Sequence, residues 1–181
     1  ARDVTGVDIS PEIVAWASEK YRAPNLRYRA GSVSAIPLDN ASVDLVVSFE
    51  TIEHLAEQEA MLREIKRVLR PQGLLIISSP DKYEYSDLPG FHNEFHVREL
   101  YVEEFEQLLR AHFARHRLLG QRIVFGSLIA GKEKSSFVSW RKTEYRCPPF
   151  PGLSQAEYCV AIAGDGALPD IPHSVLKGTL E

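Results

Sequence analysis

The stretch that decides the fold is residues 43–54, which read Val-Asp-Leu-Val-Val-Ser-Phe-Glu-Thr-Ile-Glu-His. An almost unbroken apolar run of this length predicts a strand that is buried on both faces, as in the centre of a parallel sheet. The polar end of the stretch consists of Phe49, Glu50, Glu53 and His54. Ligands of open α/β sheets bind just beyond the carboxyl ends of such strands. We therefore expect a site at this end, although a buried strand followed by an ordinary solvated loop also fits.

Helical and strand-like segments alternate on both sides of this stretch. Before it, strands at residues 4–8 and 26–30 enclose a helix that begins after Ser10, a favourable N-cap that is followed by a proline. After it, an amphipathic helix at residues 57–69 precedes an apolar strand at residues 74–79. This alternation predicts an α/β fold, with a Rossmann-like and mostly parallel sheet that is covered by helices.

The second half of the chain departs from this alternation. Residues 81–100 are aromatic, charged and rich in histidine, and an irregular run of this length predicts a functional lid over an acceptor. A third helix is expected at residues 103–113. The strand-like residues 116–124 and 157–163 have no helix between them, so they predict an antiparallel terminal hairpin. The polar, proline-containing residues 131–153 between them predict a surface insertion.

The composition excludes several classes of function. The chain has 181 residues, which fits a single domain over residues 1–181, and its formal net charge of −4 gives no electrostatic reason to bind nucleic acid. Cys147 and Cys159 make no disulfide framework, and no apolar run of about 18 residues predicts a membrane span. We expect a cytoplasmic protein with no nucleic-acid partner and no membrane span, and the oligomeric state stays open.

A carboxylate closes the first strand of the chain. In Rossmann-like units, an acid at a strand end accepts hydrogen bonds from two ribose hydroxyls, and one carboxylate offers two oxygens for them. Asp8 fits this role, although an aspartate before Ser-Pro is also a common turn residue.

Four segments occur in the order and at the spacings of a known family. They are Gly6-Val7-Asp8-Ile9-Ser10, Gly31-Ser32-Val33-Ser34-Ala35-Ile36-Pro37-Leu38, residues 43–55, and Leu69-Arg70-Pro71-Gln72-Gly73-Leu74-Leu75. Over roughly residues 4–125 the chain resembles the class I S-adenosylmethionine-dependent methyltransferases, in their small-molecule branch. Residues 93–100 and the helix after them are similar to bacterial methyltransferases that are found with glycan-building enzymes.

The resemblance implies a seven-stranded sheet whose last strand is antiparallel, and it implies S-adenosylmethionine as the cofactor. The implied cofactor-binding residues are Asp8, Ile9, Ser32, Val33, Phe49 and Glu50. The first would hold the ribose and the second would pack on the adenine. The turn after the second strand would edge the adenine, and the end of the strand at residues 43–48 would face the methionine part and the reacting methyl group.

Two features depart from the pattern of the family. Ser32 stands where the family usually has an acid, and a hydroxyl accepts the bond from the adenine amino group without charge. No glycine-rich loop precedes Asp8, so we expect that the first strand of the fold and the loop it carries are missing from this chain. The domain is therefore expected to be incomplete at its N-terminal side.

Methyl transfer to a hydroxyl is accelerated by a general base, and histidine is the usual choice near neutral pH. His96, in the expected lid, is the first candidate and His92 is the second. His54 is a third, and a role in bracing the loop after the central strand fits it equally well. His92 and His96 have the spacing of metal ligands on a helix, but the segment is not clearly helical and lacks a third ligand, so no metal is predicted.

The sequence thus predicts an enzyme that transfers a methyl group from S-adenosylmethionine to a small molecule, with a hydroxyl of a sugar or of a lipid-linked glycan as the expected acceptor. Two other functions stay open. A nicotinamide-dependent Rossmann oxidoreductase shares the acid at the strand end. A chain without the glycine-rich loop is also compatible with a degenerate, non-catalytic binding module.

Overall fold

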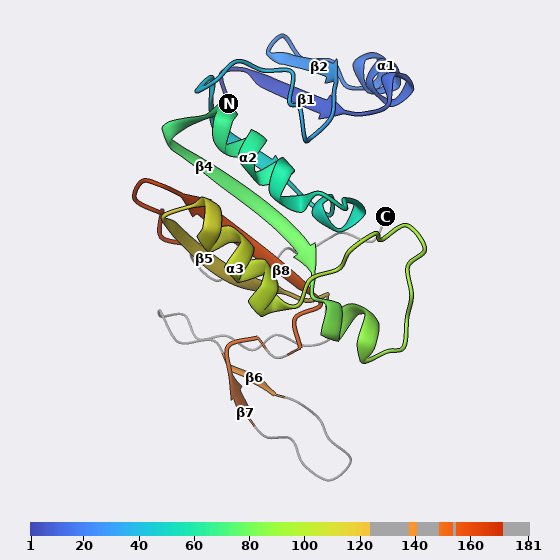
Figure 1. Ribbon diagram of the computed structural model, residues 1–181, viewed down its shortest axis with the longest axis vertical. Coiled ribbons are helices and arrows are strands. Elements are labelled where there is room, and N and C mark those ends of the chain that lie inside the picture. Colours follow the sequence, from blue (N-terminus) through green and yellow to red (C-terminus); the bar gives the residue numbers. More distant parts are fainter. Residues whose placement is uncertain (124–137, 141–148, 154, 172–181) are drawn as a thin grey trace.

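The computed structural model describes residues 1–123, 138–140, 149–153 and 155–171 (Figure 1). The strands are β1 (Val4–Asp8), β2 (Leu26–Ala30), β3 (Val43–Ser48), β4 (Leu69–Pro80), β5 (Arg115–Gln121), β6 (Val138–Trp140), β7 (Pro149–Pro151) and β8 (Tyr158–Gly164). The helices are α1 (Pro11–Lys20), α2 (Gln58–Val68) and α3 (Val102–His112), with a 3-10 turn η1 (Ile52–His54) and a π-helical turn η2 (Tyr83–Asp87). The predicted order of strands and helices is confirmed, with ends that shift by a few residues.

The larger sheet has the strand order β3-β4-β8-β5. Strand β3 is parallel to β4, while β8 is antiparallel to both β4 and β5. A second sheet joins β1 and β2 in parallel, and β6 and β7 form a short antiparallel pair. This arrangement confirms the predicted α/β fold with parallel strands and an antiparallel terminal hairpin.

Local sequence explains where the helices start. The hydroxyl of Ser10 accepts a hydrogen bond from the amide of Ile13, at 3.2 Å, and so caps α1. At the start of α3, the amide of Tyr101 donates to the carboxylate of Glu104, at 3.0 Å. Helix α2 has no such cap, and it forms because its apolar residues lie on one face that packs on the sheet.

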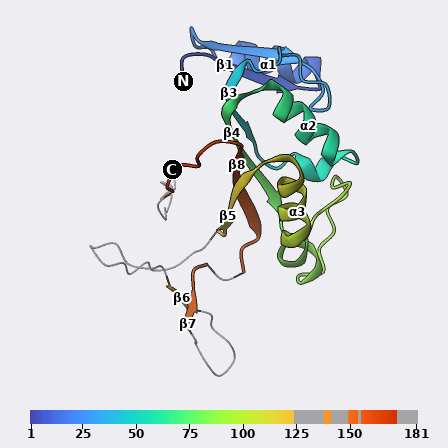
Figure 2. The same cartoon turned by 60° about the vertical axis from the view of Figure 1, so that its left-hand side comes forward.

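The core lies between the larger sheet and helices α2 and α3, which cover the same face of that sheet (Figure 2). Its fully buried apolar residues include Ile52, Met61, Leu62, Ile65, Leu75, Ile77, Phe105, Leu109 and Ala161. On the opposite face of β4, Leu74 and Ile76 are only half-buried. The alternation along β4 therefore separates a closed face from a more open one.

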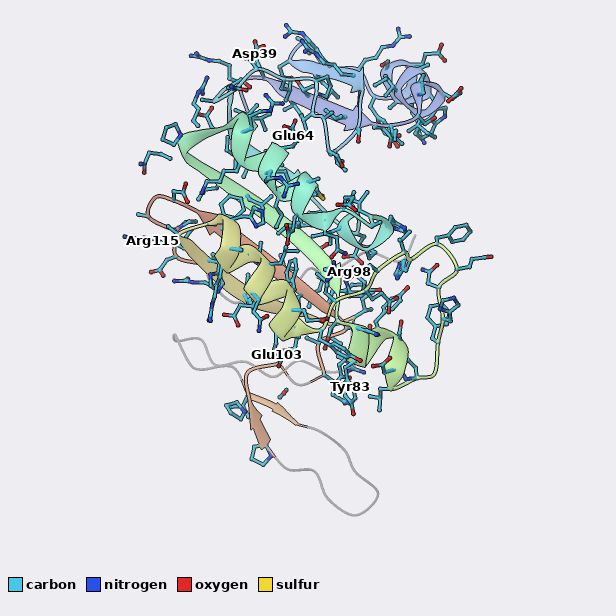
Figure 3. The ribbon with its side chains drawn as sticks, viewed as in Figure 1. Asp39, Glu64, Tyr83, Arg98, Glu103 and Arg115 are labelled. Atoms are coloured by element: carbon cyan, nitrogen blue, oxygen red, sulfur yellow. The ribbon has the colours of Figure 1, made fainter. Side chains whose placement is uncertain are left out.

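Arg67 on α2 fixes the segment that leads from β2 to β3. Its guanidinium donates to the carbonyl oxygens of Ile36 and Leu38, at 2.8 and 2.9 Å. It also pairs with Glu64, whose carboxylate accepts the amide of Ile36 at 2.9 Å. In Figure 3, Glu64 on α2 points toward this segment. Residues 31–42 are thereby attached to the core, which positions the turn after β2.

The structure corrects one prediction about β3. This strand was expected to be central and buried on both faces, but the side chain of Val47 is 53% exposed, and Leu45 is similarly exposed. Within the described residues β3 pairs only with β4, and β1 pairs only with β2. Each strand therefore has one free edge there, and no other described strand pairs with the free edge of β3.

The remaining segments agree only in part with expectation. Residues 81–100 contain the turn η2 and are otherwise irregular. Of the predicted insertion at residues 131–153, only β6, β7 and the two residues after β7 are described, and the rest lies outside the described residues. In the described part of the chain, no helix is long and apolar enough to cross a membrane.

Candidate active site

The end of β1 carries an available carboxylate. Asp8 is exposed, and one of its oxygens accepts the amide of Ser10 at 2.8 Å, which leaves the other free. Ile9 follows with 76% of its surface exposed, which is unusual for an isoleucine. A cavity of about 160 Å³ borders Asp8 and is otherwise lined by residues of β1, α1 and β2. An exposed carboxylate and an exposed apolar side chain thus follow one another at the end of β1.

The turn after β2 is attached to the same end. The amide of Gly31 donates to the carbonyl oxygen of Asp8, at 2.9 Å, so the turn begins directly beside β1. The hydroxyl of Ser32 accepts the amide of Ser34 at 3.1 Å, and Val33 packs against the core. The structure therefore brings Ser32 and Val33 close to Asp8, as the sequence implied.

The end of β3 is fixed to β4. The amide of Glu50 donates to the hydroxyl of Ser78 at 3.0 Å, and this hydroxyl donates to the Glu50 carboxylate at 2.5 Å. Glu50 has a φ of 48°, a conformation that non-glycine residues rarely adopt. Phe49 beside it is more than half exposed. Two hydrogen bonds to one side chain thus hold an unusual backbone turn at the strand end.

Beyond β3, the turn η1 meets the segment at residues 92–98. The carbonyl oxygen of Glu53 accepts the amides of Val97 and Arg98, at 2.8 and 3.0 Å. The side-chain amide of Gln58 donates to the carbonyl oxygens of Ile52 and Arg98. Three of these hydrogen bonds join the predicted lid to η1 and α2, and Figure 3 shows Arg98 near the end of β4.

Two of the three predicted histidines come together here. The rings of His54 and His96 are perpendicular, with 5.1 Å between their centroids. His54 is 41% exposed, whereas His96 is 7% exposed and hydrogen-bonds through both ring nitrogens, to Glu99 at 2.5 Å and to Asn93 at 3.0 Å. His92 is exposed and makes no hydrogen bond to the described residues, so the structure leaves it outside this group.

The sequence placed Glu53 at this site, but it did not predict which residues would be buried beside the two histidines. Glu53 is 1% exposed, and burial raises the pKa of its carboxyl group, because the charged form loses its hydration. Glu99 holds His96, and the ring of Tyr85 stacks on His96 with 5.4 Å between centroids. The one available signal was a charged residue, Glu53, directly after a core residue and before His54.

The described residues fit one side of a dinucleotide-like site. Strands β1 and β4 run in the same sense in Figure 1, and β3 is parallel to β4, so the ends of β1 and β3 that carry Asp8 and Glu50 point in the same general direction. The free carboxylate oxygen of Asp8 suits a ribose diol, and the exposed Ile9 and Phe49 suit a flat apolar ring. No described residue supplies a glycine-rich turn opposite them.

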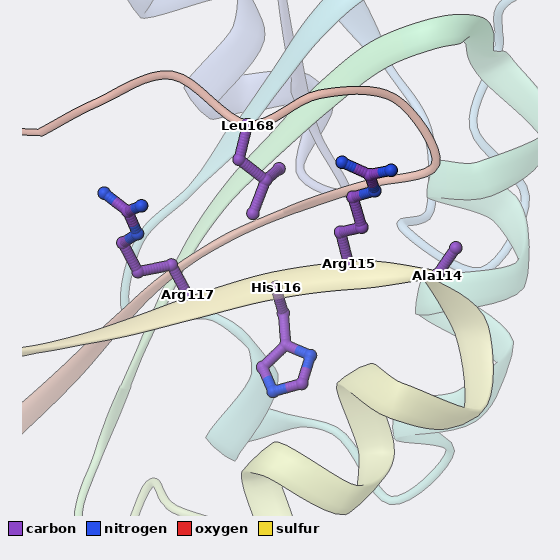
Figure 4. Close-up of a pocket in the computed structure, with 5 residues that line it drawn as sticks. All are labelled: Ala114, Arg115, His116, Arg117 and Leu168. Atoms are coloured by element: carbon purple, nitrogen blue, oxygen red, sulfur yellow. The ribbon is translucent and has the colours of Figure 1, made fainter.

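An open depression of about 430 Å³ lies elsewhere on the molecule (Figure 4). Its lining residues are Ala114, Arg115, His116, Arg117 and Leu168. Arg115 lies opposite Gly164 in the sheet, and Gly164 lies opposite Leu74 at the beginning of the apolar part of β4. The depression is thus at the opposite end of the sheet from the predicted site residues.

Comparisons with known proteins agree with this geometry. Residues 1–77 match the sequence family described as "Methyltransferase domain". A "Probable S-adenosylmethionine-dependent methyltransferase" of Mycolicibacterium smegmatis is 41% identical over 112 residues, which are 60% of this chain and 42% of that protein. A protein of the same description from Mycobacterium tuberculosis has the same identity and 39% of its length covered. The chain therefore spans about two fifths of the length of these curated relatives.

The likeness to solved structures extends over more of the chain. The protein solved in complex with the Haloferax volcanii Trm112 methyltransferase activator superposes with a TM-score of 0.61. The match covers 94% of this chain and 74% of that one at 19% identity, so it shows a shared fold. The sequence comparisons thus show similarity to methyltransferases over part of the chain, and the structural comparison shows a shared Rossmann-like fold.

Proposed function

We propose that the protein transfers the methyl group of S-adenosylmethionine to a hydroxyl of a sugar or of a lipid-linked glycan. The observation that carries the proposal is that β1 and β3 end in Asp8 and Ile9 and in Phe49 and Glu50, with exposed polar and apolar side chains, inside the region that matches the methyltransferase family. The activity, the acceptor and the site residues all belong to the proposal.

The cofactor supplies a methyl group that its sulfonium already activates, so the protein needs mainly to align the acceptor with it. Asp8 would bind the ribose hydroxyls through its free oxygen. Ile9 would pack on the face of the adenine, and Ser32 and Val33 would lie along the edge of the ring. Phe49 and Glu50 would face the methionine part, where the two hydrogen bonds between Glu50 and Ser78 keep the strand end rigid.

The segment at residues 81–100 is proposed as the acceptor lid. Its ends are joined, because the amide of Lys82 donates to the carbonyl oxygen of Leu100 at 3.0 Å. Between them, the rings of Tyr83, Phe91 and Phe95 are each more than half exposed. Exposed aromatic side chains at the mouth of a site suit the apolar faces of a sugar ring, which supports a carbohydrate acceptor.

The acceptor hydroxyl must lose a proton as its oxygen bonds to the methyl carbon. Of the histidines considered, His54 is the exposed member of the pair near the end of β3, while both ring nitrogens of His96 are occupied. These hydrogen bonds favour His54 for direct contact with the acceptor. They favour His96 for holding the lid in place.

One further strand is part of this proposal. The free edges of β1 and β3, together with the exposed Leu45 and Val47, support a parallel strand between them that carries the glycine-rich loop expected from the family resemblance. Such a strand would pair both edges and complete the cofactor site.

The test is a turnover experiment on the full-length protein with methyl-labelled S-adenosylmethionine and a set of free and lipid-linked sugars. We expect label in a methyl ether of a sugar, located by mass spectrometry. The variant His54→Ala should lower kcat by about 100-fold or more, since a positioned proton acceptor contributes about that much. His116→Ala, at the other end of the sheet, is the matched control. Label on nitrogen, or nicotinamide turnover without methyl transfer, contradicts the proposal.

A further inference from the structure

A carboxylate without a hydrogen-bond partner lies buried at the end of β3. Glu53 is 1% exposed, and neither of its side-chain oxygens accepts a hydrogen bond within the described part of the chain. A buried polar group of this kind requires a counterpart, and the surrounding side chains do not supply one.

Two imidazoles stand beside this carboxylate. Nε2 of His54 is 3.8 Å from Oε1 of Glu53. One possible ligand atom from each of Glu53, His54 and His96, which we call the Glu–His cluster, lies within 4.8 Å of the others. An ion with bonds of about 2.0–2.2 Å holds its ligand atoms about 3–4 Å apart, so small side-chain rotations suffice to close the cluster around one.

Hydrogen bonds on the far side of each ring determine which nitrogen keeps its lone pair. Nδ1 of His54 lies 2.8 Å from the carbonyl oxygen of Phe95, and because a carbonyl only accepts, this nitrogen must donate. Nδ1 of His96 donates in the same way to the Glu99 carboxylate. In each neutral ring the lone pair is then on Nε2. Metal-binding histidines are oriented by partners of the same two kinds.

The structure also shows what such an ion would displace. The side-chain nitrogen of Asn93 is 3.0 Å from Nε2 of His96 and donates to it. An ion would replace that hydrogen bond, and the Asn93 amide would turn away from the ring. The alternative is a hydrogen-bonded cluster with a protonated Glu53, which leaves both oxygens of Glu53 without partners in the described structure.

We propose that the Glu–His cluster binds a divalent transition-metal ion such as Mn²⁺, Fe²⁺, Co²⁺ or Zn²⁺. Two imidazoles and one carboxylate suit these ions better than Ca²⁺ or Mg²⁺, which prefer oxygen ligands. Three protein ligands leave at least one position for a further oxygen. That position is accessible from solvent on the side of His54, which is the exposed ligand.

The catalytic role of such an ion rests on the proposed methyl transfer, whereas the binding of the ion to the Glu–His cluster does not. At the end of β3, beside the proposed lid, an ion would bind the acceptor hydroxyl and lower its pKa. His54 would then act as a ligand, and the hydroxyl would release its proton more readily to water. This inference departs from the expectation, drawn from sequence, that the protein has no metal site.

The test is direct binding to the full-length protein after removal of metals with a chelator. Mn²⁺ is titrated and the free ion is followed by electron paramagnetic resonance, and Co²⁺ is followed by its visible absorption. We expect one ion per chain. Glu53→Gln and His54→Ala should each weaken binding by about 100-fold or more, and Glu99→Gln by about 10–100-fold through loss of orientation. Glu94→Gln and His92→Ala are matched controls that should bind like the wild type.

Thermal unfolding distinguishes a variant that has lost the metal site from a variant that has failed to fold. Without metal, Glu53→Gln should unfold at a higher temperature than the wild type, since it removes a buried carboxylate, and Mn²⁺ should raise the Tm of the wild type and of the two controls but not that of Glu53→Gln. A wild-type protein that binds neither ion, or a Glu53→Gln variant that binds as tightly, overturns the metal site. Ion binding without methyl transfer leaves the site standing and overturns the proposed function instead.

Discussion

The two halves of this molecule treat their apolar residues in opposite ways. In α2, β4, α3 and β8, which we call the closed half, the apolar side chains that face one another form a buried core. From β1 to the end of β3, which we call the open half, large apolar side chains such as Ile9, Trp16 and Val47 are half exposed or more. The polar groups differ likewise, because Asp8 is exposed whereas Glu53 and His96 are enclosed. A half that closes its own core provides rigidity, and a half with free edges and exposed apolar groups is suited to receive further contacts.

Cys159 lies on β8 in the closed half, and we expect it to react slowly with alkylating reagents. Burial raises the pKa of Cys159 from 9.0 to about 12, so the thiol stays protonated and unreactive at neutral pH. At pH 8 its alkylation by iodoacetamide should be about 1,000-fold slower in the folded protein than in urea, because three pKa units reduce the thiolate by that factor. The peptide that contains Cys159 is followed by mass spectrometry.

The same shift has a consequence for stability. A thiol whose pKa is raised by folding stabilises the folded state fully below pH 9, and this contribution is lost as the pH rises through about 12. For the alkylation experiment described above, equal rates in buffer and in urea at pH 8 would mean that solvent reaches Cys159 in the folded protein.

Phe105 on α3 tests the packing of the closed half. It is fully buried against the core, so Phe105→Ala should lower the free energy of unfolding by about 3–5 kcal/mol, as measured by chemical denaturation. The matched control is Phe95→Ala in the lid, where the exposed ring should change stability by less than about 0.5 kcal/mol. Similar losses for both variants would remove the distinction between the enclosed and the exposed residues.

Asp8 tests the open half as a cofactor surface. Asp8→Ala should weaken S-adenosylhomocysteine binding by about 10–100-fold, which corresponds to the loss of charge-assisted hydrogen bonds to the ribose. Calorimetry measures the Kd, and an unchanged melting curve shows that the exposed side chain was not needed for folding. Glu12→Ala, four residues further along the chain on α1, is the control, and equal affinities for all three proteins would remove Asp8 from the site.

Val47 tests whether the free edge of β3 is covered in the full-length protein. If the proposed strand lies beside β3, Val47→Ala should cost about 1–2 kcal/mol of unfolding free energy, since it then removes buried methyl groups. A cost near zero would show that this face stays in water, and it would contradict the proposed strand without affecting the core.

The sequence predicted well those features that depend on local patterns. The cap at Ser10, the amphipathic α2 and the apolar β4 all follow from the order of residue types, and the terminal hairpin follows from two strands without a helix between them. The burial of β3 was not predictable in this way, because it depends on which strands lie beside it. An apolar run looks the same at an edge as it does in the centre.

The candidate site was likewise predictable only where it depends on local sequence. Asp8 and Glu50 were identified because strand ends are recognisable in sequence, and each of them does lie at the end of a strand. The contacts of His96 with Glu99 and of His54 with the carbonyl oxygen of Phe95 depend on how residues 92–98 fold against η1. No period or spacing encodes that contact, so the buried position of Glu53 became visible only in the structure.

The other proposals depend on the binding of S-adenosylmethionine at the strand ends that carry Asp8, Ile9 and Glu50. The most direct measurement is a calorimetric titration of the full-length protein with S-adenosylhomocysteine and, separately, with NAD⁺. We predict saturable binding of the first compound, weakened in Asp8→Ala, and no heat of binding for the second. Binding of NAD⁺ with no response to S-adenosylhomocysteine would contradict the account.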